Sequence, residues 1–343
     1  MAMAIAGSIS DRPAFLRHML GLAKSSDLIP DVSIDGSLVK YSGLDSTSEL
    51  ENSITEMLKD AHSWLKENRD SVLSALSALS NVPNSVGLCA MVLSIAVELI
   101  ISTEVEKKEN KDSTSDMMRR VFSEEKASGV RDTMEEYMKR LRMYLHEPTL
   151  VLEETQRLEK QLSEQLTRLK NSMLHDNQMS SRSLKHWTNG AAFHLQMLIH
   201  EARLKMQSTT EQEAQLQGHQ AHIITALECY QSQLEELLME YKTYKKSTIS
   251  VTYLMPWYMA LVLSDPILLH LFVLKDEEFD RRSPALYFPN VSRTGLSENY
   301  VDYMFDNWAQ LKELKQYFSD LKGKIKDLIL QNDEFKIQKV LPV

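Results

Sequence analysis

Three histidines on one stretch of the chain offer the side chain best suited to metal binding or proton transfer. His186, His194 and His200 lie in "LKHWTNGAAFHLQMLIHEARL", residues 184–204, at spacings of eight and six. On a helix the first two share a face, whereas His200 lies roughly 120° around the axis from that face. The end of this stretch holds the first His and Glu of a zinc-protease pattern, but Leu204 stands where the second His is required. We therefore expect no metal site and interpret the histidines as members of an amphipathic helix with ordinary hydrogen bonds.

No other group of residues in the sequence forms a recognisable catalytic pattern. A glycine-rich phosphate loop and a nucleophile elbow are both absent from the sequence. The paired carboxylates Glu153–Glu154 and Glu235–Glu236 are typical of solvated helix faces. We expect a protein that is not an enzyme and that needs no cofactor.

Composition favours a helical protein in a reducing compartment. The chain has 343 residues, of which only 10 are Gly and 9 are Pro, so helix formers dominate throughout. A net charge of -9 argues against a nucleic-acid partner, which requires a basic surface; the nearest basic cluster, Lys242, Lys245 and Lys246, is interpreted as a solvated helix end. The only cysteines, Cys89 and Cys229, are interpreted as small apolar residues in a reducing compartment rather than as a disulfide framework. Without a recognisable secretory signal, we expect a cytoplasmic protein when soluble, with membrane association or export without a signal peptide as alternatives.

The periodicity of apolar residues predicts an all-α, elongated antiparallel bundle with long helices. We divide the chain into an N-terminal short helix and loops (1–46), a helical bundle (47–333) and a C-terminal tail (334–343). Pro148 marks the start of a helix whose apolar positions, Val151 to Met173, recur in coiled-coil-like steps of four and three. We expect a polar loop over 275–296. The predicted helices cover about 14–22, 48–81, 85–109, 114–146, 148–173, 183–207, 209–246 and 297–331.

Two charge-poor segments stand out from this charged helical background. Residues 71–97 contain no charged side chain, and Pro83 interrupts them as the hinge of a helical hairpin over 71–102. A helix that is apolar nearly all round is buried in a core or in lipid, and both alternatives remain open here. Residues 247–274 hold one charged side chain at neutral pH, Asp265, and predict either two strands, as a short hydrophobic β-tongue, or two short buried helices.

Membrane insertion of these two segments would involve a defined set of side chains. Glu98 is the only charge from 71 to 103, and we treat it as a candidate switch, because a lone carboxylate is costly both in a core and in lipid. A position near the solvent-exposed helix end is the alternative for this residue. The candidate insertion residues are Val86, Leu88, Val92, Leu93, Ile95, Val97, Leu99, Ile100, Ile101, Leu254, Trp257, Leu261, Leu263, Leu268 and Leu271.

The distribution of charge-poor segments within long helices resembles that of the α-helical pore-forming toxins, such as cytolysin A and the tripartite enterotoxin components. Those proteins shield a hydrophobic hairpin or tongue within a long helical bundle in their soluble form. At closer range, "RRVFSEEKASGVRDT" (119–133), residues 184–204 and "YVDYMFDNW" (300–308) resemble the rapunzel-like proteins of teleost fish. This resemblance assigns no active residues.

These observations together favour a membrane-active or membrane-associating helical protein. A trigger or assembly into a homo-oligomer would expose the hydrophobic hairpin, the second charge-poor segment, or both, and the partner would be a lipid membrane. The alternative is a cytosolic helical scaffold that binds partner helices and has no membrane role. A carrier of a small apolar ligand is a third option.

Overall fold

The structure of the chain is a computed structural model that describes residues 12–60, 121, 129–144, 147–206, 212–254, 269–289 and 291–331. Helices account for 76% of the interpretable residues, and a small antiparallel sheet accompanies them, so the mainly-α class is confirmed. The predicted hairpin over 71–102, with Pro83, Cys89 and Glu98, and the predicted tail over 334–343 lie outside the described residues.

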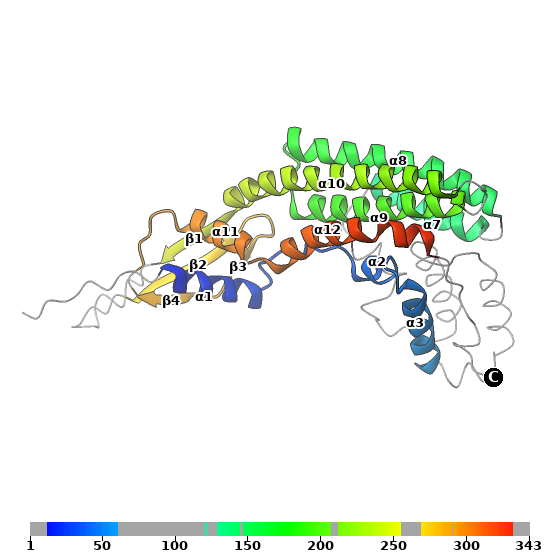
Figure 1. Cartoon of the computed structure of the whole chain (residues 1–343). Helices are drawn as coiled ribbons and strands as arrows, with labels where there is room; N and C mark the ends of the chain where they lie inside the picture. The colour runs from blue at the N-terminus through cyan, green and yellow to red at the C-terminus, as the bar shows by residue number, and fades with distance from the viewer. Residues whose placement is uncertain are drawn as a thin grey trace, which may run out of the picture.

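Long helices form the body of the molecule and run side by side along its length (Figure 1). They are α7 (Gly129–Tyr144), α8 (Pro148–His175), α9 (Ser181–Met206), α10 (Gln212–Thr248) and α12 (Ala309–Leu330). Helix α9 contacts each of the other four. Every residue from 186 to 200 is buried, so α9 lies at the centre of the bundle and presents no solvated face along this length.

Helix α8 has the features that the sequence predicts for it. It begins at Pro148, where the missing amide hydrogen costs no helical hydrogen bond. Its stripe of predicted core positions is buried between α7 and α9, with Leu158 and Leu162 fully enclosed. The coiled-coil-like spacing therefore identifies the correct face of this helix.

The charge-poor segment that follows α10 contains two strands, so the strand alternative is correct for the part described. Strand β1 (Ile249–Leu254) continues directly from α10 and pairs antiparallel with β2 (Leu269–Asp276). One face of this ladder is buried through Phe272 and Leu274. The alternation of buried and exposed positions along β1 and β2, rather than a helical repeat, explains why the segment is extended.

The prediction of a polar loop over 275–296 is wrong in part, because two further strands lie there. Strands β3 (Arg281–Arg282) and β4 (Leu286–Pro289) both pair antiparallel with β2. Phe288 on β4 packs edge-on against Phe15 at 5.5 Å between ring centroids, and Phe15 also contacts Phe272 at 4.8 Å. The cluster is buried under α1 (Arg12–Ser25), and this packing stabilises β4. Strand β4 is too short to be detected from the periodicity of its apolar residues.

The predicted single helix over 297–331 is two helices, α11 (Leu296–Asp306) and α12. The chain turns at Asn307, whose amide bonds to the carbonyl oxygens of Tyr303 and Met304, and Trp308 is extended and buried. The Trp308 ring packs against Phe305 at 5.7 Å and against Tyr241 on α10 at 6.2 Å. The helix is interrupted here because burial of the Trp308 ring contributes more to stability than a continuous helix would.

The N-terminal segment packs on both the sheet and the bundle. Helix α1 covers the sheet, and the chain then passes along the bundle to α2 (Gly36–Lys40) and α3 (Ser46–Asp60) (Figure 1). Helix α3 begins at Ser46, close to the predicted start. Cys229 is a free, exposed cysteine on α10.

The close approach of α7, α8 and α9 at Gly190 gives a stability prediction with a matched control. A Cβ at Gly190 would lie 2.7 Å from Leu166 Cδ2 and 2.7 Å from Val130 Cγ1, whereas a Cβ at Gly218 on α10 meets nothing within 4 Å. We expect Gly190→Ala to lower the free energy of unfolding, because an overpacking cost of about 1–3 kcal/mol exceeds the gain in helix propensity. Gly218→Ala should raise it by about 0.5–1 kcal/mol. Urea unfolding measures both; stabilisation by Gly190→Ala would contradict the three-helix contact.

Candidate functional site

Polar side chains are concentrated in the buried centre of α9. Seven of them are enclosed: His186, Thr188, Asn189, His194, Gln196, His200 and Arg203. The interpretation of the histidines as members of an amphipathic helix is therefore wrong, because their helix has no solvent-facing side here. Each buried polar group needs a hydrogen-bond partner on a neighbouring element, and these partners determine how the bundle is assembled.

His194 connects α9 to α8 and α10. Its Nε2 lies 3.2 Å from Glu159 Oε2 on α8, and its Nδ1 lies 3.1 Å from the Tyr230 hydroxyl on α10. Burial raises the pKa of Tyr230, so this phenol stays protonated as a hydrogen-bonding group. The Tyr230 ring also packs edge-on against Trp187 at 5.8 Å.

His200 connects α9 to α7 and α8. Its Nδ1 lies 2.8 Å from the Tyr137 hydroxyl on α7, and the same hydroxyl lies 3.1 Å from Thr155 Oγ1 on α8. One turn further on, Arg203 donates from Nε to the carbonyl oxygen of Leu328 on α12 at 2.6 Å. The histidines thus contact different neighbours, and in the part of the chain that the structure describes no three potential metal ligands lie close together.

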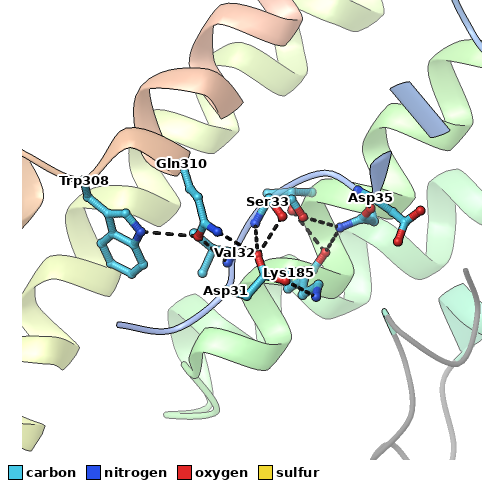
Figure 2. Close-up of polar contacts among 9 residues, drawn as sticks. Asp31, Val32, Ser33, Asp35, Lys185, Trp308 and Gln310 are labelled. Atoms are coloured by element: carbon cyan, nitrogen blue, oxygen red, sulfur yellow. Dashed lines mark hydrogen bonds and ion pairs between the residues drawn. The ribbon is translucent and has the colours of Figure 1, made fainter. Parts of the chain in front are cut away.

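A short extended segment after α1 crosses the bundle and binds α9 and α12 (Figure 2). Asp31 accepts hydrogen bonds from Lys185 Nζ on α9 at 2.6 Å and from Gln310 Nε2 on α12 at 3.1 Å. Burial opposes ionisation of Asp31, but hydrogen bonds from Lys185 and Ser33 outweigh it and lower the pKa of this carboxyl. Asn189 donates to the Ser33 carbonyl at 3.0 Å. The segment is therefore attached to the central helix at two successive turns.

A second buried polar cluster joins the bundle to the sheet at the end of α10. The side chain of Lys245 is 0% exposed and donates to Asp276 Oδ2 at 2.5 Å and to Glu278 Oε2 at 2.9 Å. Glu278 also accepts from the amide of Ser181, the first residue of α9, at 2.7 Å, and the Ser181 hydroxyl contacts Tyr241 at 2.6 Å. This cluster fixes the turn after β2 to the ends of two helices.

The interpretation of Lys245 as part of a solvated helix end is therefore wrong. Lys242 and Lys246 do reach the surface, where both pair with Asp302. The sequence contained a signal for the difference, because Lys245 follows Leu238 and Tyr241 on the core stripe of α10 at helical spacing. A lysine that continues an apolar stripe indicates a buried ion pair rather than a surface charge.

The described insertion candidates lie together on the sheet. Leu254, the last residue of β1, is 43% exposed and stands opposite Leu271 of β2, which is opposite Tyr287 of β4, itself 52% exposed. These three residues form an apolar row across three strands. The other candidates lie outside the described residues: Val86, Leu88, Val92, Leu93, Ile95, Val97, Leu99, Ile100, Ile101, Trp257, Leu261, Leu263 and Leu268, with the switch Glu98 and the hinge Pro83.

None of the helices in the described ranges combines the length and the apolar character that crossing a bilayer requires. No protein-family profile, curated protein or solved structure matches the chain.

The Lys245 cluster gives a second stability prediction. Lys245→Met keeps most of the side-chain volume but leaves Asp276 and Glu278 buried without their cation, so we expect a loss of about 3–5 kcal/mol in the free energy of unfolding. Lys246→Met, one residue along the same helix, removes an exposed pair and should cost less than about 1 kcal/mol. Chemical denaturation measures both variants; similar losses from the two would show that the buried cluster does not hold the sheet.

Proposed function

We propose that this protein associates with lipid membranes through the charge-poor segment carried between β1 and β2, with the helical bundle as its soluble body. The observation that carries this proposal is the apolar row Leu254–Leu271–Tyr287 at the end of the sheet. Isolated surface hydrophobics are ordinary, but here two exposed apolar side chains, Leu254 and Tyr287, flank the half-buried Leu271 in one row, as in an interaction site.

The chain composition next to this row supports the same function. Strand β1 ends at Leu254 and β2 begins at Leu269, and the residues between them read "MPWYMALVLSDPIL", with Asp265 as their only charge. Trp257 and Tyr258 are side chains that favour the interface between water and hydrocarbon. Contact with a membrane would cover apolar surface that water otherwise meets.

The position of the sheet in the molecule fits this role. The sheet, with α1 and α11, lies at one end of the long bundle, so its far edge is not obstructed by α8 (Figure 1). A hydrophobic tongue at the end of a helical bundle is the arrangement to which the α-helical pore-forming toxins owe their membrane activity. We therefore propose the same general mode of action, with assembly into a homo-oligomer on the membrane and with the 71–102 hairpin as a second inserting element.

A vesicle-binding experiment tests the tongue. Leu261→Asp places a charge in the proposed contact and should weaken binding of the full chain to phosphatidylcholine–phosphatidylserine vesicles by roughly tenfold or more. Met239→Asp, at a residue that is 69% exposed on α10, is the matched control and should bind as the parent does. Flotation with labelled vesicles measures both.

Equal vesicle binding by the parent and by Leu261→Asp would show that the segment between β1 and β2 does not contact the membrane. Absence of vesicle binding and of dye release by the parent over a range of lipid compositions would favour the alternative, a helical scaffold for protein partners. The expectation that the chain is not an enzyme stays a prediction.

Glu98 provides a test of the second segment. As the proposed switch of the hairpin, Glu98→Leu should keep or raise the melting temperature, because a lone carboxylate among apolar residues is costly to bury. The same change should alter dye release or oligomer size. If melting temperature, dye release and oligomer size all match those of the parent, Glu98 is a solvated residue and has no switching role.

A further inference from the structure

The hydroxyl of Tyr137 is the point at which three helices meet through one hydrogen-bonded chain. It belongs to α7 and contacts Thr155 on α8 at 3.1 Å and His200 Nδ1 on α9 at 2.8 Å. Tyr137 and Thr155 are fully buried and His200 is 2% exposed. The Tyr137 ring also packs edge-on against Phe193 of α9 at 5.9 Å, so the contact is enclosed by packed side chains.

The direction of these hydrogen bonds follows from counting protons. The Thr155 hydroxyl has one proton and donates it to the carbonyl oxygen of Val151 at 2.7 Å, a shorter contact than the one it makes with Tyr137. Tyr137 therefore donates to Thr155, and His200 donates from Nδ1 to the Tyr137 oxygen. In the neutral ring Nδ1 carries the hydrogen, so acid would add its proton at Nε2, inside the core.

A positive charge on His200 is unfavourable for two reasons. Burial removes the ring from water, and the guanidinium of Arg203 lies on the same helix and is itself buried. Burial, followed by the charge of Arg203, lowers the pKa of His200 to about 3. The imidazole is therefore neutral in the folded protein throughout the range where a solvated histidine titrates.

Several ionisable groups on the described helices around His200 make contacts with other residues. On α9, Glu201 pairs with Lys205 and accepts from Gln156 of α8 at 3.1 Å. On α8, Glu159 bonds to His194, and on α7 the phenol that faces His200 is Tyr137 itself. From α12 the polar group at this end is the Leu328 carbonyl, which already accepts from Arg203.

We propose that His200 is an acid-sensitive lock on the docking of α7 against α8 and α9. Protonation places a second cation beside Arg203 in a packed core, and separation of α7 is the movement that lets water reach the ring. In the sequence, α7 comes after the charge-poor residues 71–102 that the proposed function invokes. As a trigger for membrane association this inference rests on the proposed function; as a lock on α7 it does not.

The sign of the pH dependence follows from the lowered pKa. A base whose folded pKa lies below its unfolded value favours folding only while it is neutral. Its contribution is therefore complete above about pH 6.5 and is lost as the pH falls toward about 3. Between about pH 7.5 and about pH 4.5, uptake of this single proton should raise the unfolding equilibrium constant roughly a hundredfold.

Urea unfolding of the full chain without vesicles, at a series of pH values, tests the lock. His200→Gln can still donate to Tyr137 but cannot titrate, so its unfolding constant should rise roughly a hundredfold less than that of the parent over the same pH range. His222→Gln, at an exposed histidine on α10, should keep the steep dependence of the parent. The comparison is between the pH dependences of unfolding. A variant that is less stable than the parent at neutral pH can therefore still be used to test whether His200 causes the dependence. Equal slopes for the parent and His200→Gln would overturn the proposal.

A second measurement on the parent protein covers the case in which His200→Gln does not fold. Nitrogen NMR of the histidine rings should show His200 neutral down to about pH 4 in the folded protein, with its hydrogen on Nδ1. A ring that titrates near pH 6.5 in the folded state would contradict the lock.

Dye release at neutral and acidic pH separates the lock from the membrane role. If acid increases release by the parent and not by His200→Gln, His200 is the trigger. If the unfolding slopes differ as expected but acid leaves release unchanged, the lock stands and the trigger is overturned. If no lipid composition or pH produces release, the proposed function fails, while the unfolding result still decides the lock.

Discussion

The complete burial of α9 is the constraint on which the rest of the structure depends. A helix with no solvated face must still satisfy each polar side chain that it carries, and an unsatisfied buried polar group costs more than a hydrogen bond contributes. His194 therefore requires partners on α8 and α10, His200 a partner on α7, and Arg203 a carbonyl oxygen on α12. Apolar packing alone tolerates small rotations of the surrounding helices, whereas these directional bonds favour one arrangement.

The two ends of the molecule follow different physical rules. The bundle is held by apolar burial and by the bonds from α9, and its outer charges are ordinary surface pairs. The sheet has one covered face, under α1, and carries an apolar row whose outer members, Leu254 and Tyr287, are exposed. Besides the direct run of α10 into β1, Lys245 and its two carboxylates attach the sheet to the bundle. The sheet end and the bundle are therefore connected both covalently, where α10 runs into β1, and through a buried ionic cluster.

The sequence predicts those parts of the fold in which periodicity and burial coincide. The face of α8 is predicted correctly because its stripe of apolar residues is regular. Strands are among the stated alternatives for residues 247–274 because this segment is relatively rich in Val, Ile, Thr, Tyr and Trp and contains two prolines. Strand β4 and the break at Trp308 depend on contacts with Phe15 and Tyr241, which are distant in the sequence. Periodicity carries no information about such contacts.

The candidate site was harder to predict than the fold for a related reason. Polar residues along α9 suggest a solvated face, and only the packing of other helices around it shows that those residues are enclosed. Lys245 follows the same rule, because its charge suggests exposure although the residue continues the core stripe of α10. The position of a polar residue on an apolar stripe is better evidence of burial than its type.

Hydrogen exchange with and without bound vesicles follows the central helix and the sheet in one experiment. We expect the amides of α9 to be the slowest to exchange and to be unchanged by vesicles. Amides from 249 to 289, at the sheet and the segment it carries, should change protection when the protein binds. Fast exchange in α9 would contradict its role as the buried centre of the bundle. A vesicle effect spread evenly over the bundle and absent from the sheet would contradict membrane contact through the sheet.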